Sequence, residues 1–199
     1  MQLKEINDPI LQKLILEFPK PELSSTNSVF HDLMSCIIEQ QIHYRSTKKI
    51  FQRMLDGCNI NRLDLTNFSL FEENAISKLK LSMGKLETIS RVVDFWRNNT
   101  IDWQNLSDDE IRTKLKAIKG IGDWTIDMIL LYTLNRPTIF SVDDFHLKQI
   151  MISLYNLNPT VKLKSQMLEI AAQWGNEKSL ATLYLLEYKK QYKISKASF

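Results

Sequence analysis

Few residues in this chain can interrupt a helix. Of its 199 residues only five are glycine and five are proline, which is too few to supply the turns of a many-stranded sheet. Apolar residues instead recur at the three- and four-residue spacing of amphipathic helices along almost the whole sequence. The sequence therefore predicts an all-α protein of about nine or ten helices.

Two helix starts are marked by side chains that cap helices. Asp8 followed by Pro9 is typical of an N-cap and first helical residue, and Pro19 predicts the end of that helix. Ser107 and Glu110 have the spacing of a capping box, in which each satisfies a backbone N–H near the other. We expect helices to begin at both places.

Three other segments carry less regular patterns. Residues 59–81 are weakly periodic and predict short helices at most, whereas residues 124–134 are apolar on almost every side and predict a buried helix. Ser141 is expected to cap a further helix and to place Asp144 at its third position.

The composition excludes several classes of protein. Hydrophobic residues make up 44 % and charged residues 25 %, as in ordinary globular proteins. The longest apolar run, 128–134, is far shorter than the roughly 18 residues of a membrane helix, so we expect an intracellular protein that does not contact membranes. Two cysteines cannot form a four-thiolate zinc site or an iron–sulfur cluster, and the three histidines lack a metal-ligand pattern. We expect no metal site built from side chains.

Positive charge is unevenly distributed although the formal net charge is only +3. Four basic residues fall within eight positions that contain no acid, namely Arg112, Lys114, Lys116 and Lys119. Four more crowd the end of the sequence, namely Lys189, Lys190, Lys193 and Lys196. This distribution permits a polyanionic partner.

The most informative segment is 115–127, which contains Gly120, Ile121 and Gly122 between two predicted helices. The glycines can adopt positive φ and let another backbone approach closely, so we expect a tight helical hairpin. The turn leads into a helix N-terminus, which favours an anion such as a DNA phosphate. Two glycines between helices can equally be a plain turn, and the basic residues upstream favour the functional interpretation.

Residues 116–148 resemble the helix-hairpin-helix DNA glycosylases. Gly-Ile-Gly-x-Trp-Thr is followed about twenty residues later by Asp-Asp-Phe-x-x-Lys, and the similarity is strongest to the 3-methyladenine DNA glycosylase II type. It extends from about residue 27 to 190, although the family's Trp-x-Pro-x-Arg-Ser reads Trp-Gly-Asn-Glu-Lys-Ser at 174–179. The resemblance implies one compact glycosylase core over 1–199, made of two interleaved helical subdomains with a cleft between them and no N-terminal β domain.

The resemblance implies a catalytic role for Asp144. Enzymes of this family flip a damaged nucleotide out of the duplex and cleave its N-glycosidic bond. A carboxylate beside the sugar can stabilise the positive charge that develops there and orient water. Without the resemblance, Asp144 would be interpreted as part of a helix cap with Ser141, and Asp143 remains a helix-end carboxylate.

The resemblance also implies the reaction type. Relatives that nick the strand carry a lysine where this chain has Trp124, because an amine is needed for a Schiff base with the sugar. Lys119 lies on the other side of the glycines and is better interpreted as a phosphate contact. We therefore expect a monofunctional enzyme of base excision repair that leaves an abasic site.

The resemblance further implies which residues contact the substrate, double-stranded DNA. The backbone is expected to be held by Lys119, Gly120, Ile121, Gly122 and Thr125, and Gln41 to fill the gap left by the flipped base. The flipped base is expected to lie among Trp124, Phe145, Met128 and Tyr184. Plain core packing is the alternative for Phe145.

Such an apolar, aromatic pocket would favour cationic bases such as 3-methyladenine and 7-methylguanine. Leu186 replaces a family tryptophan and could shift this range of lesions.

The hairpin carbonyls of the family can hold a monovalent cation, and no other cofactor is expected. We expect a monomer. The alternative function is a non-catalytic helix-hairpin-helix module that only binds DNA.

Overall fold

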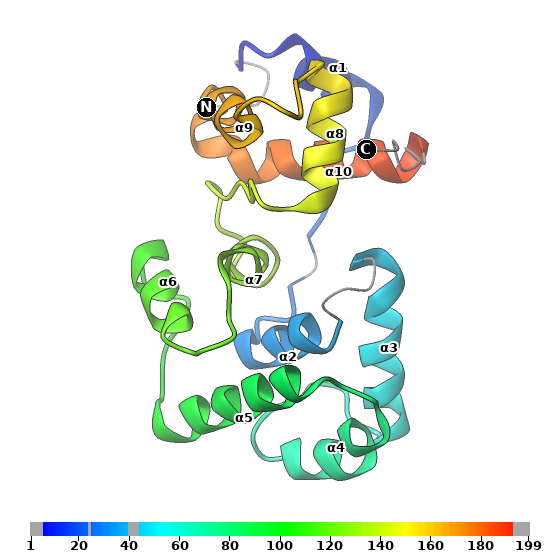
Figure 1. The fold of residues 1–199 in the computed structure, drawn as a ribbon, viewed down its shortest axis with the longest axis vertical. Coiled ribbons are helices and arrows are strands. Elements are labelled where there is room, and N and C mark those ends of the chain that lie inside the picture. The colour runs from blue at the N-terminus through cyan, green and yellow to red at the C-terminus, as the bar shows by residue number, and fades with distance from the viewer. Residues whose placement is uncertain (1–5, 24, 40–43, 193–199) are drawn as a thin grey trace. The chain divides into compact units, whose positions relative to one another are not determined.

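The computed structural model describes residues 6–23, 25–39 and 44–192. In these residues the chain forms ten α-helices and no strand (Figure 1). The predicted all-α class and number of helices are confirmed. Within the same ranges no helix combines the length and apolar character needed to cross a membrane.

The chain divides into two compact units that alternate along the sequence. The hairpin unit is Ser25–Ile129, and the terminal unit combines Met1–Ser24 with Leu130–Phe199. The cleft expected between them stays a prediction.

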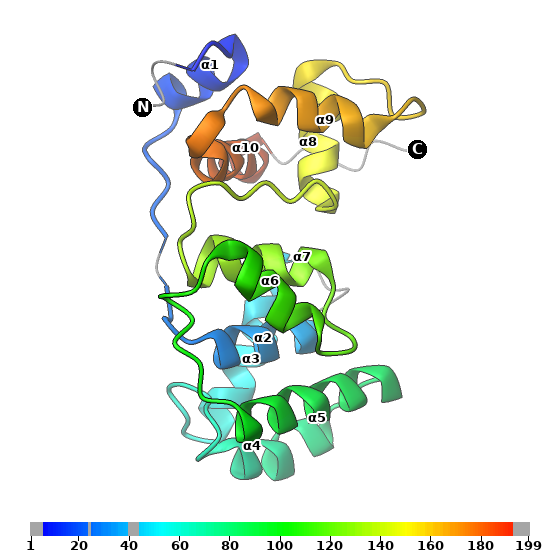
Figure 2. The ribbon, with the colours of Figure 1, turned by 90° about the vertical axis from the view of Figure 1, so that its left-hand side faces the viewer.

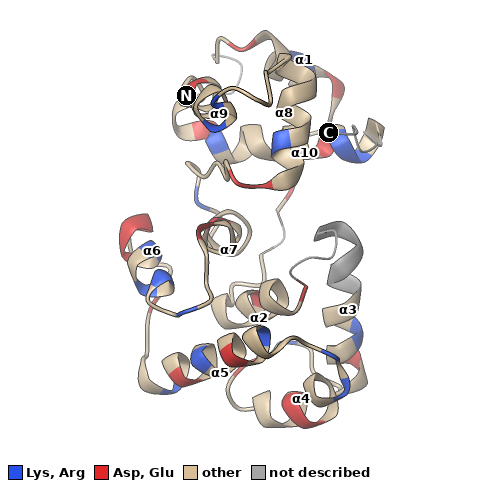
Figure 3. Cartoon of the chain, in the orientation of Figure 1, with Lys and Arg blue, Asp and Glu red and all other residues tan. Residues whose placement is uncertain are grey.

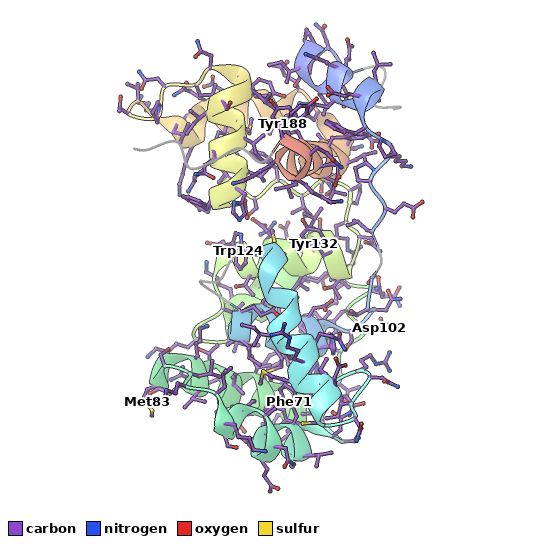
Figure 4. The ribbon with its side chains drawn as sticks, turned by 90° about the vertical axis from the view of Figure 1, so that its right-hand side faces the viewer. Phe71, Met83, Asp102, Trp124, Tyr132 and Tyr188 are labelled. Carbon is purple, nitrogen blue, oxygen red and sulfur yellow. The ribbon has the colours of Figure 1, made fainter. Side chains whose placement is uncertain are left out.

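The hairpin unit contains six of the helices. They are α2 (Val29–Glu39), α3 (Tyr44–Gly57), α4 (Phe68–Asn74), α5 (Met83–Asn98), α6 (Asp108–Lys116) and α7 (Asp123–Met128), with a short 3-10 turn η2 (Ile76–Lys78). The weakly periodic region 59–81 forms only α4 and η2, as predicted. Phe71 on α4 is completely buried in the core of this unit, whereas Met83 is 70 % exposed at the start of α5 (Figure 4).

The terminal unit contains the other four helices. They are α1 (Pro9–Glu17), α8 (Phe145–Tyr155), α9 (Leu163–Ala172) and α10 (Lys178–Tyr192), with a 3-10 turn η4 (Gly175–Glu177). The first and last of these helices pack against each other, and α8 packs across α10 (Figure 1). Helix α1 therefore completes a core that otherwise comes from the second half of the sequence.

The predicted caps of the first and sixth helices are confirmed. Asp8 caps α1 by accepting a hydrogen bond from the Leu11 N–H at 3.0 Å, and the helix ends before Pro19. Ser107 and Glu110 form the reciprocal hydrogen bonds of a capping box at α6. Both caps involve groups three residues apart, so local sequence is enough to determine them.

Two local expectations were wrong. Residues 124–134 are buried as predicted apart from the half-buried Trp124 and Tyr132, but α7 passes into a π-helical turn, η3 (Ile129–Thr133), and does not continue as a regular α-helix. Helix α8 begins at Phe145 and not after Ser141, so Asp144 is its N-cap and not its third residue. The Ser141 hydroxyl is fully buried and has no hydrogen-bond partner in the described part of the chain.

Candidate DNA-binding and active-site residues

Helices α6 and α7 form the expected helical hairpin, with the turn at residues 117–122 (Figure 2). Gly120 has φ +106°, and a Cβ added there would lie 2.1 Å from Oγ1 of Thr88 on α5. This position therefore needs glycine both for its backbone conformation and for close packing. The expected positive φ of Gly120 is confirmed, and its contact with the DNA backbone stays a prediction.

Gly122 behaves differently from Gly120. Its φ is −98°, so the expectation of a positive φ was wrong here. It is the N-cap of α7, and a Cβ added there would meet nothing within 4 Å. Gly122 thus leaves open space beside the start of α7, and the conformation of the hairpin does not depend on it.

Two ion pairs join the helices of the hairpin. Nη2 of Arg112 lies 2.7 Å from Oδ1 of Asp127, and Nζ of Lys116 lies 2.5 Å from Oδ1 of Asp123. The basic cluster is free of acids in sequence but not in space, because α7 brings an acid to each of these two residues. Figure 3 shows acidic residues at the start of α6 and basic ones further along it.

The other expected DNA-contacting residues of the hairpin fall into two groups. Lys119 is exposed, and its carbonyl accepts a hydrogen bond from Arg91 at 3.4 Å. The side chains of Ile121 and Thr125 are buried and hold the turn against the core. Their contacts with DNA, and those of Lys119, stay predictions. Gln41 lies outside the described residues.

Two of the expected base-pocket residues lie on α7. Trp124 is half-buried and projects from the first turn of the helix (Figure 4). Met128 is only 5 % exposed at the last residue of the helix. Of the two, Trp124 has the more accessible surface for stacking on a base.

Asp144 is held at the N-terminus of α8. Its Oδ1 accepts a hydrogen bond from the Leu147 N–H at 2.8 Å, and its carbonyl accepts one from the Lys148 N–H at 3.0 Å. The residue is 8 % exposed. A carboxylate fixed in this way has a set orientation and lies where the helix dipole is favourable to negative charge.

Asp143 has a different environment from its neighbour. Nζ of Lys164 lies 2.6 Å and Nζ of Lys148 3.2 Å from its Oδ1. The hydrogen bond from Lys164, followed by that from Lys148, holds the pKa of the Asp143 carboxyl below its ordinary value. The expectation of a helix-end carboxylate fits this pairing, in which Asp143 is neutralised by two lysines.

The first turns of α8 contact a lysine of α10, and sequence reasoning missed this contact. Nζ of Lys189 on α10 lies 2.7 Å from Nδ1 of His146 and 2.6 Å from Oε1 of Gln149. It also lies 5.9 Å from the ring centre of Phe145, which is 56 % exposed. Since Phe145 is exposed, core packing is excluded for it. The three-residue spacing of His146 and Gln149 indicates a shared helix face, but no local signal brings Lys189 to it.

Tyr184 lies in the core of the terminal unit. It is 4 % exposed, and burial raises the pKa of its hydroxyl. Leu186, which the resemblance places at the position of a family tryptophan, packs against the same core. Contact of Tyr184 with a base stays a prediction, for which the structure leaves little accessible surface.

A family model described as "HhH-GPD superfamily base excision DNA repair protein" matches residues 34–177 of the chain. The match covers the hairpin, Asp144, most of the hairpin unit and about half of the terminal unit. The chain belongs to the HhH-GPD superfamily.

A similar protein is YfjP of Bacillus subtilis, which is provisionally named a DNA-3-methyladenine glycosylase. It is 28 % identical over 167 residues, 79 % of this chain, and the chain spans 58 % of its length.

Solved structures of HhH-GPD proteins share this fold. The 3-methyladenine DNA glycosylase Mag1 of Schizosaccharomyces pombe, solved with abasic DNA, matches with a TM-score of 0.79 and 22 % identity over 96 % of both chains. An 8-oxoguanine glycosylase/lyase of Clostridium acetobutylicum, bound to double-stranded DNA, matches with a TM-score of 0.73 and 20 % identity. That match covers 96 % of this chain and 70 % of the enzyme. At these identities the likeness shows the fold alone.

Proposed function

We propose that this protein is a monofunctional DNA glycosylase that removes alkylated bases in base excision repair. The observation that carries the proposal is the family match over 34–177, because it includes both the hairpin and Asp144. The similarity to YfjP supports the alkylation-repair type. The orientation of Asp144 by its capping hydrogen bond supports a role that needs a fixed carboxylate.

The reaction breaks the bond between C1′ of the deoxyribose and the base nitrogen. The bonding electrons leave with the base, so a base that carries a positive charge departs as a neutral molecule. Asp144 stabilises the positive charge that develops on the sugar, and water adds to C1′ and gives up a proton. The products are the free base and an abasic site.

The absence of strand cleavage is proposed from Trp124. An indole cannot form a Schiff base with the sugar, whereas a lysine at this position could. The likeness to a glycosylase/lyase does not oppose this proposal, since it concerns the fold alone. The exposed Lys119 is assigned to the DNA backbone, where a point charge suits a phosphate.

The proposed substrates are purines alkylated at N3 or N7, such as 3-methyladenine and 7-methylguanine. Trp124 and Phe145 both offer accessible aromatic surface. Stacking on an aromatic ring is strengthened by a positive charge on the base, by roughly 0.5–2 kcal/mol. Alkylation also weakens the glycosidic bond, so part of the discrimination comes from the lesion.

Double-stranded DNA is the proposed partner of a monomeric enzyme, with the turn at 117–122 on the phosphate backbone. The monovalent cation expected at the hairpin carbonyls also stays a proposal. The exposed Lys119 and the open space at Gly122 support contact with a phosphate.

The test is incubation of the purified protein with methylated duplex DNA. We expect release of 3-methyladenine and 7-methylguanine, formation of alkali-labile sites, and no strand break without alkali. Borohydride should trap no covalent protein–DNA adduct. Duplex binding without base release would favour the non-catalytic binding module, and a trapped adduct would contradict the monofunctional assignment.

A further inference from the structure

The ion pair between Lys116 and Asp123 lies at the mouth of the hairpin turn. Lys116 is the last residue of α6, and Asp123 is the first residue of α7. The pair therefore brackets the turn at 117–122. Its two side chains are 53 % and 68 % exposed, so both are accessible from solvent.

We propose that Asp123 competes with DNA phosphate for Lys116 and thereby limits the affinity of the hairpin for DNA. The inference rests on the proposed function, which assigns this turn to the DNA backbone. The inference adds a residue, Asp123, that weakens DNA binding. The sequence pattern of this segment indicates only residues that strengthen DNA binding.

Both charges of this ion pair lie next to the turn and are exposed to solvent. A phosphate that approaches the open space at Gly122 meets the Asp123 carboxylate one residue further along the chain. Like charges in contact with solvent repel each other over a range of about 10 Å at 0.1 M salt. The carboxylate also holds the Lys116 ammonium at 2.5 Å. Binding of a phosphate to Lys116 must therefore displace a carboxylate that is already in place.

The two ion pairs of the hairpin differ in what they can do. Asp127 is only 12 % exposed beside Arg112, so that pair is part of the packing between α6 and α7. Asp123 is exposed, and an exposed ion pair contributes little to stability, about 0–1 kcal/mol. Asp123 can therefore be changed without loss of the fold, and its effect on DNA can be measured separately.

The contact with phosphate carries no sequence information. The effect of Asp123 should thus be equal on undamaged duplex and on duplex with an abasic-site analogue. By weakening both, Asp123 would reduce the time that the protein spends on undamaged DNA and on its own product. It would not change which base is chosen.

The experiment compares the dissociation constants of wild type, Asp123→Asn and Asp109→Asn for both duplexes between 50 and 200 mM salt. Asp109 is an exposed acid in the first turn of α6, so the control removes the same charge from the same hairpin. Thermal unfolding of each variant verifies the fold.

For Asp123→Asn we expect about tenfold tighter binding at 50 mM salt and about threefold at 200 mM, because one additional phosphate contact steepens the salt dependence by about 0.9. Asp109→Asn should change affinity by less than about twofold, as expected for a charge outside the contact. The double variant Lys116→Gln/Asp123→Asn should lose the gain and bind within about twofold of wild type.

Three results would overturn the inference. They are equal effects of Asp123→Asn and the control, an unchanged salt dependence, or a gain that persists in the double variant. Base release by wild type is measured separately. If it is absent while the binding changes are as expected, the glycosylase proposal fails and the inference stands. If wild type binds no duplex, both fail.

Discussion

The indole Nε1–H of Trp174 donates a 2.8 Å hydrogen bond to Oδ2 of Asp8, a residue 166 positions earlier in the sequence. The same oxygen accepts a 2.8 Å hydrogen bond from the hydroxyl of Tyr155 at the end of α8. Asp8 is 4 % exposed and Trp174 is fully buried. One carboxylate thus caps α1 and ties it to the last residue of α8 and to Trp174, just after α9.

Replacement of Asp8 by alanine should be strongly destabilising. It removes the cap of α1 and leaves the buried N–H of Trp174 and the half-buried hydroxyl of Tyr155 without their acceptor, which together should lower the free energy of unfolding by about 2–4 kcal/mol. Urea unfolding would measure the loss, with Glu22→Ala as a control on the same segment, since Glu22 is exposed. A loss below about 1 kcal/mol would show that these hydrogen bonds do not hold α1.

The two glycines of the hairpin should respond differently to alanine. Gly120→Ala forces a Cβ onto Thr88 at positive φ and should destabilise the protein by more than about 1 kcal/mol. Gly122→Ala should leave the unfolding temperature nearly unchanged, because nothing lies within 4 Å of its Cβ.

The bulkier Gly122→Val should weaken binding of all duplexes alike. Unchanged affinity of Gly122→Val for an abasic-analogue duplex would exclude this turn as the anchor.

The adjacent aspartates provide a matched pair for catalysis. Asp144→Asn should abolish base release and leave duplex binding within a few-fold, because an amide keeps the shape but cannot offset charge on the sugar. Asp143→Asn should have a mild effect, since Asp143 is already paired with two lysines. Single-turnover release of 7-methylguanine would compare them. Retained release by folded Asp144→Asn would exclude the catalytic assignment.

Trp124 should determine the preference for cationic bases. Trp124→Ala is expected to slow release of 7-methylguanine because it removes a stacking surface, with a loss of roughly 0.5–2 kcal/mol in transition-state stabilisation, or about 2- to 30-fold in rate. The same variant is assayed on uracil in the same duplex, on which wild type should be poor. A wild-type preference for uracil, or an unchanged methylated-base rate in folded Trp124→Ala, would contradict the proposed pocket.

The pairing of Asp143 should give a small pH dependence of stability. Because its pKa is lower in the folded protein than the ordinary 3.8, its contribution is present above that value and is lost as the pH falls below it. The carboxylate is 44 % exposed, so Asp143→Asn should cost at most about 1 kcal/mol at pH 7. Urea unfolding at pH 7 and at pH 3 should show the difference shrinking. An equal difference at both would mean that the ion pairs contribute nothing.

The sequence predicts those features that depend on nearby residues. The cap at Asp8 could be predicted because its partner lies three residues away, whereas its bonds to Tyr155 and Trp174 depend on tertiary packing. The start of α8 was misassigned because Ser141 and Asp144 are both good caps, and only the fold decides between them.

The candidate site shows the same division. The hairpin and Asp144 come from a sequence motif, and the position of Asp144 on a helix start was nearly right. The pairing of Lys116 with Asp123 depends on how the turn closes, and the arrival of Lys189 at His146 depends on the packing of α10. The sequence pattern did not predict these two contacts, because they are made by long side chains or between residues distant in sequence.

The division of the chain into two units also bears on its synthesis. Helix α1 has nine residues, fewer than the roughly 12–15 at which an isolated helix becomes even marginally stable. At about 5–20 residues per second, the ribosome needs roughly 8–33 s to add the 166 residues between Asp8 and Trp174. During that time Ser25–Ile129 is completed as one continuous segment. The hairpin unit can therefore fold on the ribosome before the last quarter of the chain, which contains the partners of α1, has been synthesised.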